Sequence, residues 1–246
     1  MSMLHSICIC SKSGQMLFST DIEGGSKSFL ALSGLMAVFQ VNTKRCFGQD
    51  STLNYLKLNN VAMTIAYNET SGVQVILIHH ANYYRSLAKC IAQEILQSFS
   101  EHFGNNSDQS QFKRFNALLG PAIQSASFSL LRSLLDETNG AIIYAVIFCE
   151  GDSLYAYPTN ANLISVAANL QQLQFSLQET ARLADDDPYE LVTDSGQVIT
   201  HIVLFGTTTI VLQVKKERHT PEVVAAVKST IEMLDLCFRT AEGLMG

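Results

Sequence analysis

A lysine and two serines follow a pair of glycines near the N-terminus, in the stretch EGGSKSFLALSGLMAVFQ, Glu23 to Gln40. Such a loop could bind phosphate, because glycines let backbone N–H groups wrap the anion and lysine supplies positive charge. The phosphate-loop pattern GxxxxGK[ST] requires glycine immediately before the lysine and again at the start of the loop. Here Ser26 precedes Lys27, and Asp21 occupies the first glycine position, where its carboxylate would repel phosphate. The glycines therefore indicate a turn before a helix.

Cysteine, histidine and aspartate residues are the candidates for nucleophilic catalysis or metal binding. One group combines a cysteine with histidines near the end of a predicted strand and along the helix that follows it: His79, His80, Cys90 and His102. A Cys–His dyad needs both side chains within hydrogen-bond reach and a third orienting group, which the sequence does not place. The sequence has no CxxC, HExxH or HxH spacing, and Asp185–Asp187 lacks the further ligands and glycine of a calcium loop. We expect no catalytic residue, no cofactor and no metal ion.

Composition narrows the class of protein. The chain has 246 residues, of which 47% are hydrophobic and only 15% charged, against about 25% charged residues in typical soluble proteins. Such a chain can bury a large core and also hide surface against a partner. The net charge of −6 argues against nucleic acid as a partner. The N-terminal stretch MSMLHSICICSKSG lacks the features of a secretory signal, so we expect an intracellular protein with buried, free thiols.

Hydrophobic spacing in the first half predicts a hairpin, a helix, three strands and a second helix. The hairpin joins Ser6–Cys10 to Gln15–Ser19 around a glycine turn. A helix is expected over about Ser26–Gln40, where apolar residues recur three or four positions apart. The second helix starts near Asn82 and can end at Gly104. The three strand-like runs between the helices are STLNYLKL, VAMTIAY and VQVILIHH.

The polar stretch GNNSDQSQ, Gly104 to Gln111, has no apolar anchor and predicts a linker. The predicted organisation is a first domain over 1–104, a linker over 105–111 and a second domain over 112–246. The second domain adds a leading helix, restarted at Pro121, and then repeats the order of the first: two strands, a helix over about 160–183, three strands and a last helix. Each half is predicted as a five-stranded, mostly antiparallel sheet with flanking helices, an α/β sandwich.

Two predicted helices are apolar on more than one side. The helix over 26–40 has no charged residue between Lys27 and Lys44, and the helix over 160–183 has none before Glu179. Because a helix with one buried side normally carries charge on the other, each of these helices should be buried twice. The second burial is against another part of the chain or against another protein. The predicted protein interface consists of Leu30, Gly34, Ala37, Ile164, Ala168 and Phe175.

This order of elements resembles a known superfamily of domains. The first half, from SICICSKSGQMLFS to the helix that ends at Phe103, resembles a longin domain: hairpin, helix, three strands, helix. The second half, from the Pro121 helix through AIIYAVIFCEGDSLYAYP to the Pro221 helix, is similar to a roadblock domain, a related fold with an extra leading helix. The resemblance rests on the order and length of the elements and covers most of the chain.

The resemblance implies a binding platform and not an enzyme. Longin and roadblock domains pair with similar domains through helices or sheet edges, and many belong to complexes that recruit, activate or inactivate small GTPases on endomembranes. It implies a scaffold or adaptor subunit in trafficking or signalling, cytoplasmic and peripheral on endomembranes. The implied partners are another longin or roadblock subunit and a small GTPase. The two doubly apolar helices are equivalent in the two halves and lie where a roadblock-type dimer would pack.

Two departures and one alternative limit what the resemblance implies. The chain lacks the third domain and the long insertions of three-longin exchange factors, so direct exchange activity does not follow. A small-molecule sensor related to GAF or PAS domains could share the sandwich topology. Such a sensor would need a pocket inside the curve of the sheet, and a specific ligand would then raise its thermal stability.

Overall fold

The computed structural model describes residues 3–22, 29–48, 51–103, 109–149, 152–159 and 190–245, together with 172, 173, 175, 176 and 179. The chain divides into two compact units, one of Met1–Ser129 with Leu236–Gly246 and the other of Leu130–Asp235. No helix in the described part of the chain is long and apolar enough to cross a membrane.

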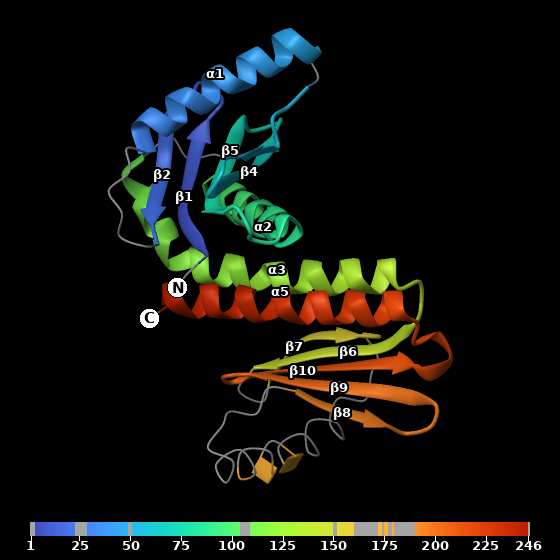
Figure 1. Ribbon diagram of the computed structural model, residues 1–246. Coiled ribbons are helices and arrows are strands. Elements are labelled where there is room, and N and C mark those ends of the chain that lie inside the picture. Colours follow the sequence, from blue (N-terminus) through green and yellow to red (C-terminus); the bar gives the residue numbers. More distant parts are fainter. Residues whose placement is uncertain are drawn as a thin grey trace. The chain divides into compact units, whose positions relative to one another are not determined.

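The first unit is built on a five-stranded antiparallel sheet in the order β2-β1-β5-β4-β3 (Figure 1). Its helices and strands, in chain order, are β1 (Leu4–Ser11), β2 (Met16–Asp21), α1 (Phe29–Phe47), β3 (Tyr55–Lys57), β4 (Val61–Asn68), β5 (Val73–His80) and α2 (Arg85–Phe103). The β4–β5 turn uses Gly72 at φ +67, a conformation that glycine adopts without strain. The side chain of Asn68 closes the same turn by accepting hydrogen bonds from the N–H groups of Thr70 and Ser71.

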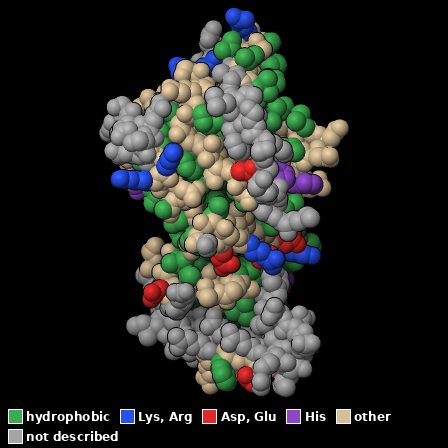
Figure 2. Space-filling view, turned by 90° about the vertical axis from the view of Figure 1, so that its left-hand side faces the viewer, with side chains coloured by type: hydrophobic (Ala, Val, Ile, Leu, Met, Phe, Trp, Pro, Cys, Tyr) green, Lys and Arg blue, Asp and Glu red, His purple; other side chains and the backbone are tan. Residues whose placement is uncertain are grey.

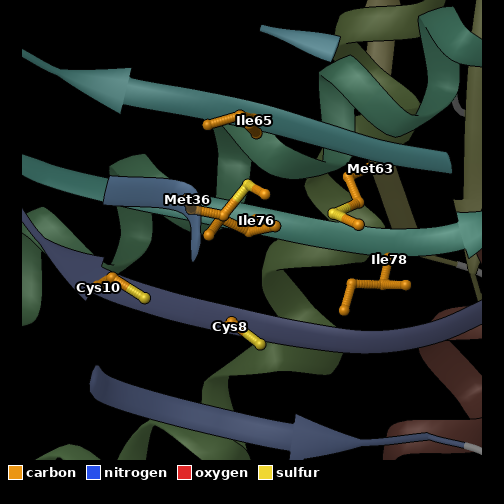
Figure 3. Close-up of a cluster of buried hydrophobic side chains, with 7 residues drawn as sticks. All are labelled: Cys8, Cys10, Met36, Met63, Ile65, Ile76 and Ile78. Atoms are coloured by element: carbon orange, nitrogen blue, oxygen red, sulfur yellow. The ribbon is translucent and has the colours of Figure 1, made fainter. Parts of the chain in front are cut away.

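The two faces of this sheet have different covers. On one face a buried cluster brings together β1, β4, β5 and α1, and Figure 3 shows its members: Cys8, Cys10, Met36, Met63, Ile65, Ile76 and Ile78. On the other face α2 packs against β4 and β5 through a continuous buried side: Leu87, Ala88, Ile91, Ala92, Ile95, Leu96 and Phe99. Apolar residues on both faces of one sheet explain why the middle of β4 and nearly all of β5 are buried.

Helix α1 is longer than the sequence predicted. The predicted end at Gln40 is wrong, since the helix continues to Phe47. Lys44 and Arg45 lie in its last turn, where positive charge favours the carbonyl end of a helix. Gly48, at φ +108, then ends it.

An aromatic cluster ties the segment after α2 to the first unit. The turn η1 (Gln109–Phe115) precedes helix α3 (Asn116–Glu137). The ring of Phe115 meets Phe18 of β2 at 5.5 Å and Phe99 of α2 at 5.2 Å, both edge-on. The compact units therefore do not divide at 105–111. The predicted domain boundary there stays a prediction, because a compact unit can include a helix contributed by a neighbouring domain.

The predicted restart at Gly120-Pro121 is wrong, because α3 runs through it as one helix with Pro121 inside. The last helix, α5 (Pro221–Met245), approaches α3 closely at this point. A Cβ atom on Gly120 would lie 2.4 Å from Cγ of Met245. One turn further along α3, the thiol of Cys237 donates a hydrogen bond to the carbonyl of Ile123 at 3.0 Å. Gly120 thus serves this close approach and does not mark a break.

The second unit contains the other five-stranded antiparallel sheet, in the order β7-β6-β10-β9-β8. Its strands are β6 (Ile142–Cys149), β7 (Asp152–Tyr157), β8 (Glu190–Asp194), β9 (Val198–Phe205) and β10 (Thr208–Lys215). One face carries a buried cluster of Val146, Phe148, Ile202 and Val211. The short turn η2 (Lys216–Arg218) leads from β10 to α5. Most of the helix predicted over 160–183 lies outside the described residues. The predicted fold class, two five-stranded antiparallel sheets with flanking helices, is confirmed.

Candidate protein-interaction surface

Helix α1 carries a row of exposed aliphatic side chains. Leu35, Val38 and Val41 are 48%, 56% and 50% exposed, and their spacing of three residues puts them on one side of the helix. Figure 2 shows hydrophobic side chains gathered at the top of its view, where α1 lies, with basic side chains beside them. These three residues are called the α1 row below. Such a row on a folded domain is typical of a surface that a partner covers.

The opposite side of α1 holds the helix on its sheet. Met36 is fully buried in the cluster of Figure 3, and Phe39 packs against that cluster. Gln40 adds a polar contact, since its side-chain Nε2 donates to the carbonyl of Leu53 and its Oε1 accepts from the N–H of the same residue, both at 3.2 Å. The α1 row therefore points away from a side that the chain itself already fills.

The interface residues predicted from the sequence fall mostly beyond what the structure describes. Leu30, Gly34 and Ala37 lie on α1, but their side chains are outside the described set. Ile164 and Ala168 lie outside the described residues altogether. Phe175 is described, and its side chain is 67% exposed. The six-residue interface stays a prediction.

Sequence reasoning missed Leu35 and Val38, which it assigned to no side of the helix. The signal was present in the spacing. A helix turns by about 100° per residue, so Val38 lies on the side opposite the buried Met36. Val41 follows Val38 at the same interval of three as Leu35 precedes it. Placing the buried residues first and then looking for apolar residues opposite them would have found the row.

His79, a candidate for catalysis in the sequence, is held in two structural hydrogen bonds. Nδ1 of the buried His79 lies 2.9 Å from the carbonyl of His80, and its Nε2 lies 2.9 Å from the hydroxyl of Thr64. Because the carbonyl can only accept, Nδ1 carries the hydrogen and Nε2 accepts from Thr64. Burial lowers the pKa of His79; the hydrogen bond to the carbonyl of His80 opposes this, and the nearby imidazoles of His5 and His80 add a smaller lowering. A neutral, doubly bonded imidazole is typical of a core position.

The thiols of Cys8, Cys10 and Cys90 are poorly suited to nucleophilic chemistry. Burial raises the pKa of Cys8 and of Cys10 to about 12, and it also raises the pKa of Cys90. A thiol must be deprotonated to attack an electrophile or bind a metal. Among the described residues, no group of three or more His, Cys, Asp or Glu side chains is placed to hold a metal ion.

A groove of about 860 Å³ lies at the edge of the first sheet, between β4 and α2. Its lining on α2 consists largely of charged and amide side chains: Arg85, Lys89, Gln93, Gln97 and Glu101. A sensor of the GAF or PAS kind would need a pocket inside the curve of the sheet. This groove, with a largely polar wall on α2, lies beside the sheet instead.

No family model matches the chain, and no curated protein matches it. Solved structures do match parts of it. MglB of Thermus thermophilus is 20% identical, with a TM-score of 0.41 over 49% of this chain and 92% of that one. MglB of Myxococcus xanthus is 12% identical, with a TM-score of 0.38 over 44% of this chain and 89% of that one. A roadblock/LC7 domain from Streptomyces avermitilis is 10% identical, with a TM-score of 0.34 over 40% and 84%.

The order of elements agrees with the resemblance inferred from the sequence. In the first unit the hairpin β1–β2, α1, three strands and α2 follow one another as in a longin domain. In the second half α3 precedes the hairpin β6–β7, and three strands and α5 complete the set. Each half therefore has a five-stranded antiparallel sheet with flanking helices, and the described order of its elements agrees with the longin and roadblock order expected from the sequence.

Proposed function

We propose that this protein is a non-enzymatic scaffold or adaptor subunit that binds a related longin or roadblock subunit through the α1 row. The observation that carries the proposal is the exposure of Leu35, Val38 and Val41 on a helix whose other side is already buried by Met36. Burying exposed aliphatic side chains against a partner is favourable, by about 25 cal/mol for each Å² of apolar surface removed from water.

The charges on α1 suit the same role. The helix has no acidic residue in its first turn, and its positive charges, Lys44 and Arg45, lie in the last turn. No charged residue lies between Phe29 and Lys44, so the middle of the helix carries no charge that would have to be stripped of water when a partner binds. An uncharged centre with charge at the rim is the usual composition of a protein interface.

The wider role rests on the resemblance to longin and roadblock domains. We propose that the complex binds and regulates a small GTPase and associates peripherally with endomembranes from the cytoplasmic side. The two hydrogen bonds of the buried His79 and the raised pKa of the buried Cys8 support a binding role over a catalytic one.

Mild affinity purification of the tagged full chain, read by quantitative mass spectrometry, tests the proposal. The tagged chain is compared with Val38→Glu and with Val224→Glu, the same change at an exposed position on α5. We expect a longin or roadblock subunit and a small GTPase to co-purify with the chain and with Val224→Glu, and to be lost with Val38→Glu. Equal recovery with both variants would contradict the role of the α1 row, and recovery of a partner set without a GTPase would contradict the wider role.

A further inference from the structure

Strand β4 is paired on its outer edge over only part of its length. β3 covers it through three opposed pairs, Tyr55 with Thr64, Leu56 with Met63 and Lys57 with Ala62. One further bond follows, from the N–H of Ile65 to the carbonyl of Asn54 at 2.9 Å. β4 itself continues to Asn68, and within the described part of the chain no strand pairs with this last stretch of its outer edge.

The backbone of Tyr67 points toward that open edge. Successive residues of a strand direct their N–H and C=O groups to opposite sides, so residues two apart face the same neighbour. Because the N–H of Ile65 bonds toward β3, the N–H and C=O of Tyr67 also point away from β5. Unpaired groups of this kind are a template for an added strand.

The chain before β3 does not continue along this edge, since the predicted strand STLNYLKL is observed only over Tyr55–Lys57. Continuing the register of β3 backwards would set Leu53 opposite Ala66 and Thr52 opposite Tyr67. Because the C=O of Asn54 bonds toward β4, the backbone groups of Thr52 would face β4 in that register and those of Leu53 would point away. The side-chain amide of Gln40 on α1 binds both backbone groups of Leu53, at 3.2 Å each, and so holds this segment to α1.

The open edge forms one wall of the groove between β4 and α2. The facing wall is a row of α2 side chains spaced four residues apart, Arg85, Lys89, Gln93, Gln97 and Glu101. The volume of about 860 Å³ is in the range that holds small ligands and short segments, about 300 to 1,000 Å³. A segment of extended chain fits such a space, whereas a folded domain does not.

The charges of the groove differ at its two ends. At the end beside β3, the guanidinium of Arg85 lies 4.4 Å above the centre of the Tyr55 ring, and Lys89 follows one turn later. At the other end Glu101 lines the groove with Glu69, which directly follows β4. Gln97 donates a hydrogen bond to Glu101 at 2.9 Å and holds that carboxylate in place. A partner segment should therefore be negative at one end and positive at the other.

We propose that this groove binds an extended peptide segment of a partner protein, which adds to β4 as an antiparallel strand. Bonds to the N–H and C=O of Tyr67 would supply the main-chain contacts of strand addition. Because the added strand runs opposite to β4, its N-terminal end lies near Glu69 and its C-terminal end near Arg85. The segment therefore carries a basic side chain toward its N-terminus and an acidic side chain toward its C-terminus. This site lies on the α2 side of the sheet and does not depend on the α1 row.

A phage-displayed library of random linear peptides, about ten residues long so that they exceed the open edge, provides the probe. The library is selected on the full chain and counter-selected on Tyr67→Pro, which removes the edge N–H. We expect enriched peptides with a basic residue before an acidic one. The most enriched peptide, labelled with fluorescein, should bind the chain and Val38→Glu equally by anisotropy, and both Tyr67→Pro and Lys89→Glu should weaken its binding at least about tenfold.

Two further measurements separate strand addition from other causes. Replacing the acidic residue of the peptide by lysine should restore binding to Lys89→Glu, which keeps the test independent of whether Tyr67→Pro folds. Bound peptide should also slow hydrogen exchange at the Tyr67 N–H, as seen by NMR. The proposal is overturned if no peptide is enriched over the counter-selection, or if Lys89→Glu binds the original peptide unchanged. It is also overturned if the free chain self-associates and Tyr67→Pro abolishes this, since the edge would then belong to a second copy.

Discussion

Helices α1 and α2 have the same length of 19 residues and cover opposite faces of one sheet, yet they use their apolar residues differently. Helix α2 turns a continuous apolar side to β4 and β5 and lines the groove with charged and amide residues. Helix α1 buries Met36 and leaves Leu35, Val38 and Val41 exposed. The chain itself buries the apolar side of α2, while α1 keeps exposed apolar surface that a partner could cover.

The difference begins in the order of residue types. On α2, charged or amide residues recur at every turn between the apolar ones, so water is a good solvent for its outer side. On α1, no charged residue occurs between Phe29 and Lys44, so its outer side gains little from water. Stability within the chain should therefore depend on α2, and association on α1. Four changes, in order of decreasing effect, test this division.

The largest loss of stability should come from Ile91→Ala on α2. Ile91 is fully buried against the sheet, and truncating such a side chain leaves a cavity that costs about 2 to 5 kcal/mol of unfolding free energy. Leu35→Ala on α1 is the control, since it removes a side chain of similar size from an exposed position. Urea unfolding followed by circular dichroism measures both. Equal losses for the two variants would show that the α1 row is core and not surface.

Gln40→Ala should have a smaller effect, of about 1 to 2 kcal/mol, because it removes the two bonds to Leu53. The variant also releases Leu53 from α1, so the segment before β3 can approach β4 and bring Thr52 opposite Tyr67. We therefore expect weaker binding of the edge-selected peptide together with slower hydrogen exchange at Tyr67 in the unliganded chain. Faster exchange at Tyr67 would mean that Gln40 supports the edge in another way. Asn42→Ala, at an exposed position on the same helix, is the control.

Acid should weaken the α2 face of the sheet through His79. Its folded-state pKa lies below the ordinary value of 6.5 because of burial, so the unfolded chain binds a proton more readily. This contribution to stability is complete above pH 6.5 and is lost as the pH falls below that value toward the folded-state pKa. The slope can reach at most about 1.4 kcal/mol per pH unit. Chemical denaturation between neutral and mildly acidic pH should show the slope in the native chain and a flatter profile in His79→Gln.

The smallest effect on stability should come from Val38→Glu, within about 0.5 kcal/mol, because the position is exposed and glutamate is a good helix former. Its thermal unfolding should match that of the native chain, while partner binding is lost. A clear fall in melting temperature would show instead that Val38 packs within the chain. Val224→Glu supplies the matched change outside the α1 row.

Much of the architecture could be predicted because it depends on local pattern. Alternating apolar strands and the four-residue period of Leu87, Ile91, Ile95 and Phe99 specify elements before any tertiary contact forms. Errors occurred where distant residues overrule local signals. Gly120-Pro121 suggests a break, but Met245, far along the chain, packs against Gly120 within one continuous helix. The predicted strand over STLNYLKL is observed only over Tyr55–Lys57, and Leu53 before it is bound by a side chain on α1, a contact that periodicity cannot detect.

The sequence by itself determined the order of elements, the two sheets and the apolar excess on α1, because these follow from the spacing of apolar residues. Only the tertiary structure decided which apolar residues of α1 stay exposed, since burial depends on where Met36 meets the sheet. It also decided that β4 keeps an open edge. Just before β3, the amide of Gln40 holds both backbone groups of Leu53 to α1, and such a pairing depends on three-dimensional proximity and leaves no mark in sequence periodicity.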